Sequence, residues 1–530
     1  MIPLSFRWAL YKKTIACLFL VLLTGAISVS KSYGQDEQKY KNFGQHFGQR
    51  LKTPAYAVPN GPFKANYQSL ASHKAVPKWF RNAKFGIYAH WGVYSVPAYS
   101  SEWYPRNMYN KKSKVYKHHL KTYGSPLKFG YPDFVPMFKA QDFNPDAWAK
   151  LYKEAGAKFA GPVAEHHDGF AMWNSTWTPW NAGDMGPHQD VVGELAKAIR
   201  KQGLKFITSF HHARNGLWKK NGKWKGHYSY VKKYFPSLLN NPKRAIMYGD
   251  MPRKTFFQMW RGELEEVINQ YHPDIMWFDF DLKWIPDSVK TKYLAFYFNK
   301  ANKNGQQVMV TSKNHEFPDN VGIQDFERGR AAKIRKTPWL TDDAIGNNSW
   351  GYVKNLQLKS TGYLIHELID IVSKNGQFLL NISPKADGII PEAQKRRLLG
   401  MGRWLKQNGE AIYGTRPWKV FGEGPTRLKK GGAFVKKIHY TPKDIRYTKK
   451  GNFVYAIEMG WPGPNKKITL HAWAKNKIGS NVKIQDVSVL GSMQSIQWNW
   501  QKQGLVVTTP SKAPNKQAIV FKIYTKNQDN

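Results

Sequence analysis

Two patterns of apolar positions alternate between residues 77 and 418. Short apolar runs typical of buried strands are followed by longer segments in which apolar residues recur every three or four positions, as on the inner face of a helix. The strand-like runs cover residues 84–92, 158–169, 204–212, 274–282, 306–314 and 377–383, and the helical segments cover residues 143–157, 190–203, 256–273, 289–305 and 363–376. This alternation is typical of β-α units, and the number of units favours a (β/α)8-like barrel.

The pattern changes after Trp418. Short segments of alternating apolar and polar residues, separated by turn residues, predict an all-β sandwich over residues 419–530. These segments cover residues 434–441, 452–460, 466–474, 482–491, 505–510 and 518–525. The predicted fold class is therefore α/β, with a (β/α)8-like barrel over residues 77–418 followed by a C-terminal β-sandwich, and residues 35–76 read as a polar leader.

The N-terminus has the pattern of a secretory signal peptide over residues 1–34. Arg7, Lys12 and Lys13 precede an apolar run over residues 14–29, and small residues follow it. That run is too short for a comfortable membrane anchor. Cys17, the single cysteine, lies inside it, so the mature chain can form no disulfide. We therefore expect a periplasmic or secreted bacterial protein with no stable membrane insertion after cleavage.

The charge of the chain points to an anionic partner. Lysine and arginine total 81 against 36 acidic residues, a net charge of +45. Such a field attracts polyanions. Export and the absence of a nucleic-acid-binding motif argue against nucleic acid, which leaves a sulfated or uronic glycan as the favoured partner. The alternative is that the basic surface only keeps the protein soluble. The oligomeric state stays open.

Polar residues stand where the predicted strands end. His90, the pairs His166–His167 and His211–His212, and Asp279 each close a strand-like run. Since barrels of this kind place their chemistry at the C-terminal ends of the strands, these positions predict an active site. The alternative is a set of structural histidines. His118 and His119 lie away from this pattern and are interpreted as surface residues.

Acidic residues near these ends suggest glycoside hydrolysis, which uses two carboxyl groups flanking the scissile bond. Asp279 is the candidate nucleophile, and Asp281, two residues on, is predicted to point to the same side. The alternative for Asp279 is a rim acid paired with a lysine or arginine. The candidates for the second carboxyl group are Glu102, Asp325, Glu327, Asp342 and Asp343.

Metal catalysis is not favoured. The adjacent His166 and His167 point in different directions at a strand end, so one ion cannot easily bind both. The chain has no H-E-x-x-H helix, no G-x-S-x-G and no phosphate-binding loop. We therefore predict no metal and no cofactor, and expect neutral imidazoles that bind sugar hydroxyls.

Several long motifs resemble one known family. They are WFRNAKFGIYAHWGVYSVPAYSSEWY, EHHDGFAMWNS, DIMWFDFD, NSWGY and the stretch from LIDIVSKNG to GTRPW. Together they resemble the glycoside hydrolase family 29 α-L-fucosidases over about residues 77–418, and the β tail fits the C-terminal sandwich of that family. The resemblance implies a fucose pocket lined by His90, Glu102, Trp103, His166 and His167, with Asp279 as nucleophile.

Four departures from the family pattern affect the predicted site. Glu165 stands where many members have lysine, and Ser209–Phe210 followed by His211 stands where many have a tyrosine pair. Lys313 stands where many have arginine, and Leu340 replaces the glutamate of a Trp-Glu pair found in one subgroup.

Because Leu340 cannot transfer a proton, the acid/base has to come from elsewhere. We choose Glu327 by its distance before Trp339, with Asp325 as second choice. His211, Lys313 and Trp350 complete the predicted substrate-binding set.

The resemblance implies an exported retaining exo-α-L-fucosidase. It would release terminal α-L-fucose from a glycan, favoured by the charge to be acidic or sulfated, through a covalent fucosyl-enzyme, without a cofactor. Two alternatives stay open. One is a glycosidase of altered specificity, for a sulfated fucose or an α-galactoside. The other is a non-catalytic carbohydrate-binding protein.

Overall fold

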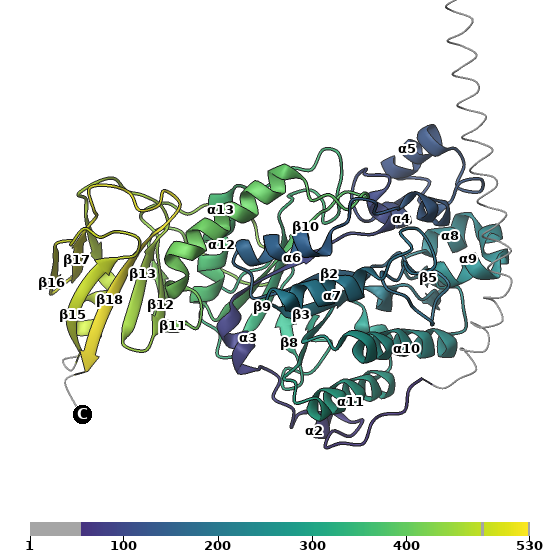
Figure 1. Ribbon diagram of the computed structural model, residues 1–530, viewed down its shortest axis with the longest axis horizontal. Coiled ribbons are helices and arrows are strands. Elements are labelled where there is room, and N and C mark those ends of the chain that lie inside the picture. The colour runs from purple at the N-terminus through teal and green to yellow at the C-terminus, as the bar shows by residue number, and fades with distance from the viewer. Residues whose placement is uncertain (1–54, 479–481, 528–530) are drawn as a thin grey trace, which may run out of the picture.

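Eight parallel strands close a barrel in the computed structural model, which describes residues 55–478 and 482–527 (Figure 1). The strands are β1 (Phe85–Ala89), β2 (Phe159–Glu165), β3 (Lys205–Phe210), β6 (Ile275–Phe278), β7 (Met309–Lys313), β8 (Ile323–Asp325), β9 (Trp339–Ala344) and β10 (Gly376–Ile382). Their order around the barrel is β1-β10-β9-β8-β7-β6-β3-β2. The predicted barrel is confirmed.

The barrel strands are buried on both faces, which is why they read as continuous apolar runs. Tyr88, Ile207, Trp277 and Leu340 belong to the cluster that fills the inside of the barrel. Outward-facing residues of the same strands pack under the surrounding helices. Those helices are α6 (Pro145–Glu154), α7 (Val191–Lys201), α10 (Arg253–Tyr271), α11 (Asp287–Lys303), α12 (Thr361–Ser373) and α13 (Glu392–Asn408).

Local signals in the chain set the ends of these elements. Helix α6 begins at the Asn-Pro-Asp sequence, where the Asn144 side chain accepts a hydrogen bond from the Ala147 amide and Pro145 takes the first helical position. Helix α10 ends at His272, which adopts a left-handed conformation before Pro273. Helix α3 (Lys78–Ala83) precedes β1, and its Phe80 and Ala83 join the cluster inside the barrel.

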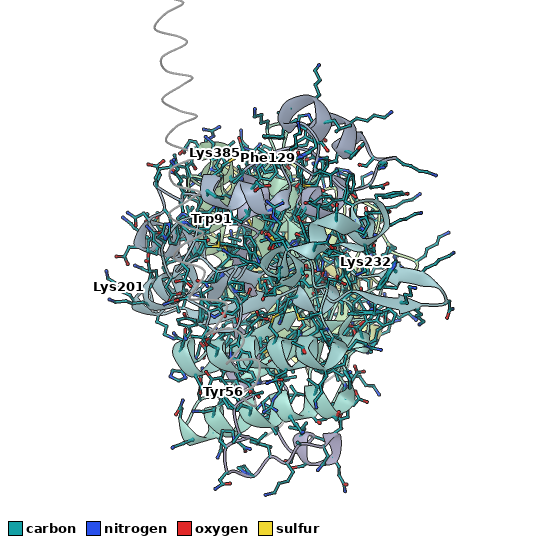
Figure 2. All side chains as sticks on the ribbon, turned by 90° about the vertical axis from the view of Figure 1, so that its right-hand side faces the viewer. Tyr56, Trp91, Phe129, Lys201, Lys232 and Lys385 are labelled. Carbon is teal, nitrogen blue, oxygen red and sulfur yellow. The ribbon has the colours of Figure 1, made fainter. Side chains whose placement is uncertain are left out.

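Short elements gather around the C-terminal ends of the strands (Figure 1). They are η1 (Val93–Ser95), α4 (Tyr104–Asn107), α5 (Lys114–Tyr123), η3 (His212–Arg214), β4 (Trp218–Lys220), β5 (Lys223–Lys225), α8 (Ser229–Tyr234), α9 (Pro242–Met247) and η5 (Leu282–Trp284). Figure 2 looks toward this end and shows long nitrogen-tipped side chains around its outline, with Lys201 and Lys232 at opposite edges. The basic composition is thus visible as a basic periphery.

The C-terminal region forms two antiparallel sheets with a core of their own, which confirms the β-sandwich. The core contains Trp418, Tyr447, Trp473 and Phe521. One sheet has the order β11 (Arg416–Glu423), β12 (Ile445–Lys450), β13 (Phe453–Glu458), β18 (Ile519–Asn527) and β15 (Val482–Val489), and the other has the order β14 (Lys467–Leu470), β17 (Gly504–Thr508) and β16 (Trp498–Gln501).

A buried ionic network joins the sandwich to the barrel. Arg446 of β12 lies 2.8 Å from the Asp370 carboxylate of α12, and Lys374 lies 2.8 Å from its other oxygen. Nearby, the Trp404 indole of α13 donates a hydrogen bond of 3.0 Å to the carbonyl of Ala518. All of these side chains are buried.

Three sequence predictions about local structure differ from the fold. Residues 434–441 form no strand, since the neighbouring bridge pairs Gly432 with Arg330 of the barrel instead. Strands β8 and β9 have no counterpart in the prediction, because acidic residues interrupt their apolar pattern. His119, predicted at the surface, is fully buried: its ring is hydrogen-bonded to the hydroxyl of Tyr104 and the carbonyl of Phe129.

The predicted signal peptide and much of the predicted leader lie outside the described residues. Within the part that the structure describes, no helix combines the length and apolarity needed to cross a membrane. The domain limits at residues 34, 76 and 418 stay predictions.

Candidate active site

The strand ends bring the predicted residues together at one rim of the barrel. His90 follows β1, His166 and His167 follow β2, and His211 follows β3. Asp279 follows β6 directly, Lys313 is the last residue of β7, and Glu327 comes two residues after β8. The observed grouping is what parallel closure of the barrel produces, because every such strand ends on the same side.

Asp279 is buried among cationic and hydrogen-bonding groups. One of its oxygens, Oδ2, lies 3.0 Å from His167 Nε2 and 3.1 Å from His211 Nδ1, while Oδ1 lies 2.8 Å from the Lys313 ammonium. Burial raises the pKa of Asp279, but Lys313 and the imidazoles oppose it, and the pKa of this carboxyl lies well below its usual range. Asp279 is therefore ionised at neutral pH.

His167 has two acceptors as partners. Its Nδ1 lies 2.7 Å from the carbonyl oxygen of His211, and its Nε2 faces the Asp279 carboxylate. His167 therefore bridges the backbone after β3 and the Asp279 carboxylate, and it holds that carboxylate in place.

Lys313 connects the two candidate catalytic carboxyl groups. Its ammonium lies 2.8 Å from Asp279 and 2.8 Å from Oε2 of Glu327. Asp342 lies 3.6 Å from the same nitrogen. The two contacts hold the oxygens of Asp279 and Glu327 within twice 2.8 Å of each other.

Glu327 differs from Asp279 in protonation. Its side chain is 15% exposed, against 5% for Asp279. Burial, together with the negative charges of Asp342 and Asp279, raises the pKa of Glu327 to about 7, although Lys313 opposes the shift. One carboxyl group is therefore held ionised while the other keeps a proton near neutral pH, which is the division of roles between a nucleophile and a general acid.

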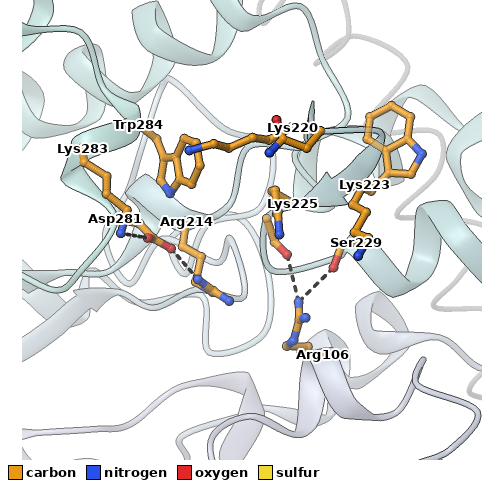
Figure 3. Close-up of a pocket in the computed structure, with 12 residues that line it drawn as sticks. Arg106, Arg214, Lys220, Lys223, Lys225, Ser229, Asp281, Lys283 and Trp284 are labelled. Carbon is orange, nitrogen blue, oxygen red and sulfur yellow. Dashed lines mark hydrogen bonds and ion pairs between the residues drawn. The ribbon is translucent and has the colours of Figure 1, made fainter.

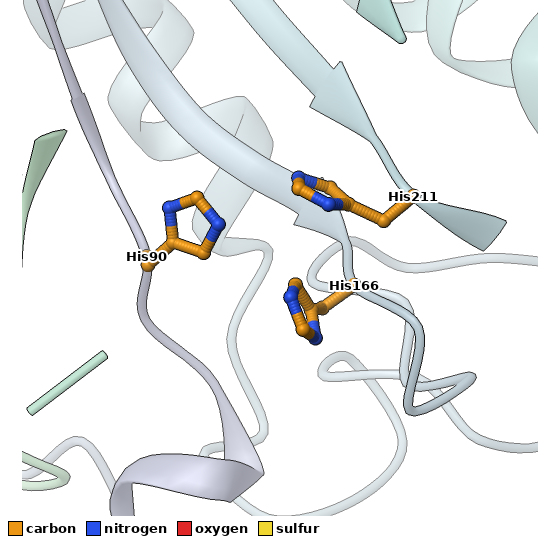
Figure 4. Close-up of side chains that lie close together, drawn as sticks. All are labelled: His90, His166 and His211. Atoms are coloured by element: carbon orange, nitrogen blue, oxygen red, sulfur yellow. The ribbon is translucent and has the colours of Figure 1, made fainter. Parts of the chain in front are cut away.

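Three imidazoles, those of His90, His166 and His211, face one another (Figure 4). Of these, His211 contacts Asp279. The ring of His211 lies 5.1 Å from that of His90 and 4.7 Å from that of His166, centre to centre. Burial lowers the pKa of all three rings, that of His211 to about 4. The neighbouring imidazoles add to the shift for His90 and His166, whereas Asp279 opposes it for His211. All three are neutral at physiological pH.

Neutral imidazoles in this arrangement can bind hydroxyl groups. Within the described ranges, His166 Nδ1 and His211 Nε2 are buried and have no hydrogen-bond partner. His90 Nδ1 lies 2.8 Å from Oδ1 of Asn381, which leaves its Nε2 for a ligand. A sugar with several hydroxyls would satisfy these atoms.

The same nitrogens fall into groups that could hold a metal ion. His90, His166 and His211 offer atoms within 4.8 Å of one another, as do His167, His211 and Asp279. His166 and His167 belong to different groups, in agreement with the expectation that they point apart. The Lys313 ammonium is close enough to contribute to the low pKa of His90 and His211, and it disfavours a second cation there.

Glu102 and Trp103 contribute differently from each other. Glu102 accepts hydrogen bonds from the Trp350 amide at 2.9 Å and from the Ser349 hydroxyl at 3.1 Å, so it fixes the loop that places Trp350 5.3 Å from the His90 ring. Trp103 packs on His167, with ring centres 5.1 Å apart. Both residues reach the site, and Glu102 does so chiefly as a support for Trp350.

Asp281 does not point toward Asp279, contrary to the prediction. Its backbone adopts a φ of 79°, so the alternation of a strand ends before it. Its carboxylate pairs instead with Arg214 and Lys283. The prediction from the two-residue spacing is wrong because β6 ends at Phe278, so the alternation of side chains does not continue to Asp281.

The other candidate acids have structural partners. Asp325, the second choice for the acid/base, is buried and accepts a hydrogen bond of 3.0 Å from the Asp342 amide. Asp342 accepts one of 3.0 Å from the Tyr88 hydroxyl, and Asp343 lies 2.5 Å from Lys359. Leu340 packs inside the barrel.

Two nearby residues were not predicted from the sequence. Asn381 of β10 holds His90, and a polar residue inside the apolar run QFLLNIS was the available signal. His227 packs against His167, with ring centres 5.4 Å apart, and no pattern in the chain marked it. His212, in contrast, turns away from the site toward Glu263 of α10, 3.7 Å away.

Comparisons with known proteins agree with this geometry. Residues 51–410 match the family model described as Alpha-L-fucosidase, and residues 439–524 match the Alpha-L-fucosidase C-terminal domain. Tissue alpha-L-fucosidase of Rattus norvegicus is 31% identical over 491 residues, covering 88% of this chain and 94% of that protein. The human tissue alpha-L-fucosidase is also 31% identical, covering 87% of this chain and 90% of its own.

Solved structures give the same result. The crystal structure of Thermotoga maritima alpha-fucosidase in complex with fucose is 29% identical, has a TM-score of 0.67 and covers 87% of this chain and 100% of that one. The resemblance seen in the motifs, the closed parallel barrel and the two matching domain models therefore agree, and the chain belongs to the α-L-fucosidase family of glycoside hydrolases.

Proposed function

We propose that this family member is a retaining exo-α-L-fucosidase in which Asp279 is the nucleophile and Glu327 the acid/base. The observation that carries the proposal is the double contact of Lys313, which holds the two carboxyl groups close together. Retaining glycosidases need a separation of about 5 Å, because one carboxylate attacks the sugar directly, whereas inverting enzymes leave room for a water.

In the first step, an Asp279 oxygen attacks the anomeric carbon while the bond to the leaving oxygen breaks. Glu327, with a pKa of about 7, gives its proton to that oxygen. The products of this step are a fucosyl ester on Asp279 and the free aglycone alcohol.

The second step reverses the proton transfer. Once Asp279 is esterified it has lost its charge, so it no longer raises the pKa of Glu327 and no longer neutralises Lys313. Both changes favour the Glu327 carboxylate, which then takes a proton from the attacking water. Lys313 thereby couples the charge state of the nucleophile to that of the acid/base.

The remaining residues suit a deoxy sugar. His90, His166 and His211 offer nitrogens for its hydroxyls, and aromatic rings, among them Trp350, can cover the apolar methyl and ring face. The net charge of +45 and the basic periphery support an acidic or sulfated glycan as substrate. The signal-like N-terminus supports a periplasmic or secreted location.

Activity measurements distinguish the proposed function from its two alternatives, a non-catalytic carbohydrate-binding protein and a glycosidase of altered specificity. A protein that only binds carbohydrate would need no acid near Asp279, yet Glu327 contacts the same ammonium. Altered specificity rests on Glu165, His211 and Lys313, of which His211 and Lys313 contact Asp279.

A panel of nitrophenyl glycosides tests specificity, and proton NMR of the first product tests the mechanism. We expect turnover of the α-L-fucoside with α-L-fucose formed first. Formation of β-L-fucose first would overturn the retaining mechanism, and preference for the α-galactoside would overturn the assigned sugar.

A further inference from the structure

A hollow lies among the loops that follow β3 and β6 (Figure 3). It has a cavity volume of about 630 Å³. Six basic side chains line it and a single acidic one: Arg106, Arg214, Lys220, Lys223, Lys225 and Lys283, with Asp281. Trp224 and Trp284 form parts of its wall. We call this hollow the basic pocket.

The basic pocket continues from the catalytic site through direct contacts. His167, which binds Asp279, packs on Trp103. The Arg214 guanidinium in turn lies 5.5 Å from the centre of the Trp103 ring and 5.0 Å from that of Phe280. The basic pocket therefore lies close to the catalytic site, on the side of Trp103 and Phe280.

Most of the positive charge in the pocket has no acidic counterpart. Asp281 is shared by Arg214 and Lys283. Arg106 donates to the carbonyls of Gly226 and His227 and to the Ser229 hydroxyl, all neutral. Within residues 55–478 and 482–527, no carboxylate forms an ion pair with Arg106, Lys220, Lys223 or Lys225.

The guanidinium groups of Arg106 and Arg214 add to this imbalance. Arg214 Nε is buried and has no hydrogen-bond partner in the described part of the chain. Burial lowers the pKa of Arg106, and the charge of Arg214 lowers it further, so the two cations repel each other across the pocket. A bound anion would relieve that repulsion.

The wall of the pocket is built before any ligand arrives. Strands β4 and β5 form a hairpin closed by Asn221 and Gly222, both with positive φ (50° and 71°), the combination of a type I′ turn. The Lys220 ammonium lies 4.9 Å from the centre of the Trp284 ring. Cations beside indole rings suit a sugar ring that carries a negative group.

We propose that the basic pocket binds the sugar unit on the leaving side of the fucose, and that this unit carries a sulfate ester or a carboxylate. The proposal rests on the proposed function, because it assigns the leaving side of that same reaction. Binding energy from the anionic unit would then act while the glycosidic bond breaks.

The experiment compares kcat/KM for three fucosyl disaccharides of one linkage, which differ only in whether the second sugar is neutral, sulfated or a uronate. Nitrophenyl fucoside, which has no second sugar, is the reference for each variant. We expect kcat/KM at low salt to be about tenfold higher for at least one anionic disaccharide than for the neutral one. The sulfated and uronate arms identify which anion the pocket takes.

The test variant is K220Q/K223Q/K225Q, because these three lysines are exposed on the hairpin and form no ion pair there. The matched control is K483Q/K502Q/K516Q in the sandwich, which changes the net charge equally at exposed positions. The ratio of anionic to neutral kcat/KM should fall about tenfold in the test variant and stay at the wild-type value in the control.

The two proposals fail in different ways. Absence of turnover of nitrophenyl fucoside by the wild type would overturn the proposed function. Turnover of that substrate with equal kcat/KM for the neutral and anionic disaccharides would overturn the pocket alone. If the ratio of anionic to neutral kcat/KM fell equally in both triple variants, the effect would come from the overall charge. That result would likewise overturn the proposal for the pocket.

Discussion

Two buried carboxyl groups lie beside histidines in this molecule, and they are held in opposite charge states. Asp279 contacts His167 and His211 at the inner rim of the barrel. Glu263 of α10 lies 3.7 Å from His212, between the barrel and the helix layer. Both side chains are almost completely inaccessible to solvent, yet the pKa of Asp279 is lowered and that of Glu263 is raised well above its usual range.

The main difference is the cation Lys313, and the hydrogen bonds of His167 and His211 to Asp279 act in the same direction. Lys313 lies 2.8 Å from Asp279 and offsets the cost of burying its charge. The neighbours of Glu263 are Glu165, which shares its site, and Glu266, whose charge adds to the shift. His212 is neutral, since burial lowers its pKa to about 3. Burial therefore decides how costly a charge is, and the neighbouring cation decides whether it forms.

Residue 165, where the sequence departs from the expected family pattern, lies in the site of Glu263. In this chain Glu165 places a second carboxyl group in the same site, and burial raises its pKa well above the usual range, with the charge of Glu263 adding to the shift. The two groups remain together by keeping protons.

Removing the ionised member of the comparison should have the largest effect. We expect Asp279→Ala to lower kcat by about 10⁴-fold or more, because no other group can form the ester. Azide should restore activity by entering the vacated space and should yield a fucosyl azide. Substantial activity of Asp279→Ala without azide would contradict the assignment. As a control for loss of fold, Asp279→Asn should have the same melting temperature as the wild type.

The acid/base should show dependence on the leaving group. Glu327→Gln should slow natural disaccharides by about 10²- to 10⁴-fold, and slow aryl fucosides with good leaving groups far less, because those leave without a proton. In the wild type, kcat/KM should fall above about pH 7 as Glu327 loses its proton. Equal losses for both substrate classes would point to another acid, Asp325 first.

Removing the cation should make Asp279 resemble Glu263. In Lys313→Met we expect the pKa of Asp279 to rise, since burial then acts with less opposition. The acidic limb of the kcat/KM profile should move to higher pH, with a loss of about 10²-fold at neutral pH that Lys313→Arg partly restores. An unchanged acidic limb would contradict the role given to Lys313.

Adding a cation beside Glu263 should have the smallest effect of these changes, and the effect should be on stability. A carboxyl whose pKa is raised by folding stabilises the protein while protonated, and this contribution is lost as the pH rises from the ordinary pKa toward the raised one. Glu165→Lys should remove this loss of stability. The difference in the free energy of unfolding between the variant and the wild type should therefore grow with pH, to about 1–2 kcal/mol at pH 8.

Thermal unfolding from pH 5 to 8 measures that gain. Glu392→Lys is the matched control, because it makes the same change of charge at a side chain that is 65% exposed, and it should show no such trend. A gain for Glu165→Lys that stays constant with pH would show that packing, and not protonation, is responsible.

Much of the site could be predicted because strand ends are visible in the chain. His90, His166, His167, His211 and Asp279 each close an apolar run, and parallel closure alone brings them together. The position of Glu327 depended on the resemblance, since β8 has only three residues and its apolar pattern is short.

Other features depend on geometry that spacing does not encode. The turn at Asp281 follows from a positive φ after β6. The double contact of Lys313 and the pairing of Glu165 with Glu263 join residues 14 and 98 positions apart, and only the closed barrel with its packed helix brings them together. The basic pocket likewise depends on a hairpin that has no apolar alternation to mark it.

The network of Arg446, Asp370 and Lys374 bears on how far the chain can be divided. Two separate family models match it, which invites the view that the barrel could be produced or recombined without its sandwich. Yet Asp370 is fully buried and takes one of its two cations from the sandwich, and the Trp404 indole takes its acceptor there too. A truncated barrel would expose this surface with its polar groups half satisfied. We therefore expect the two domains to unfold together, as one cooperative unit, although a separate family model matches each.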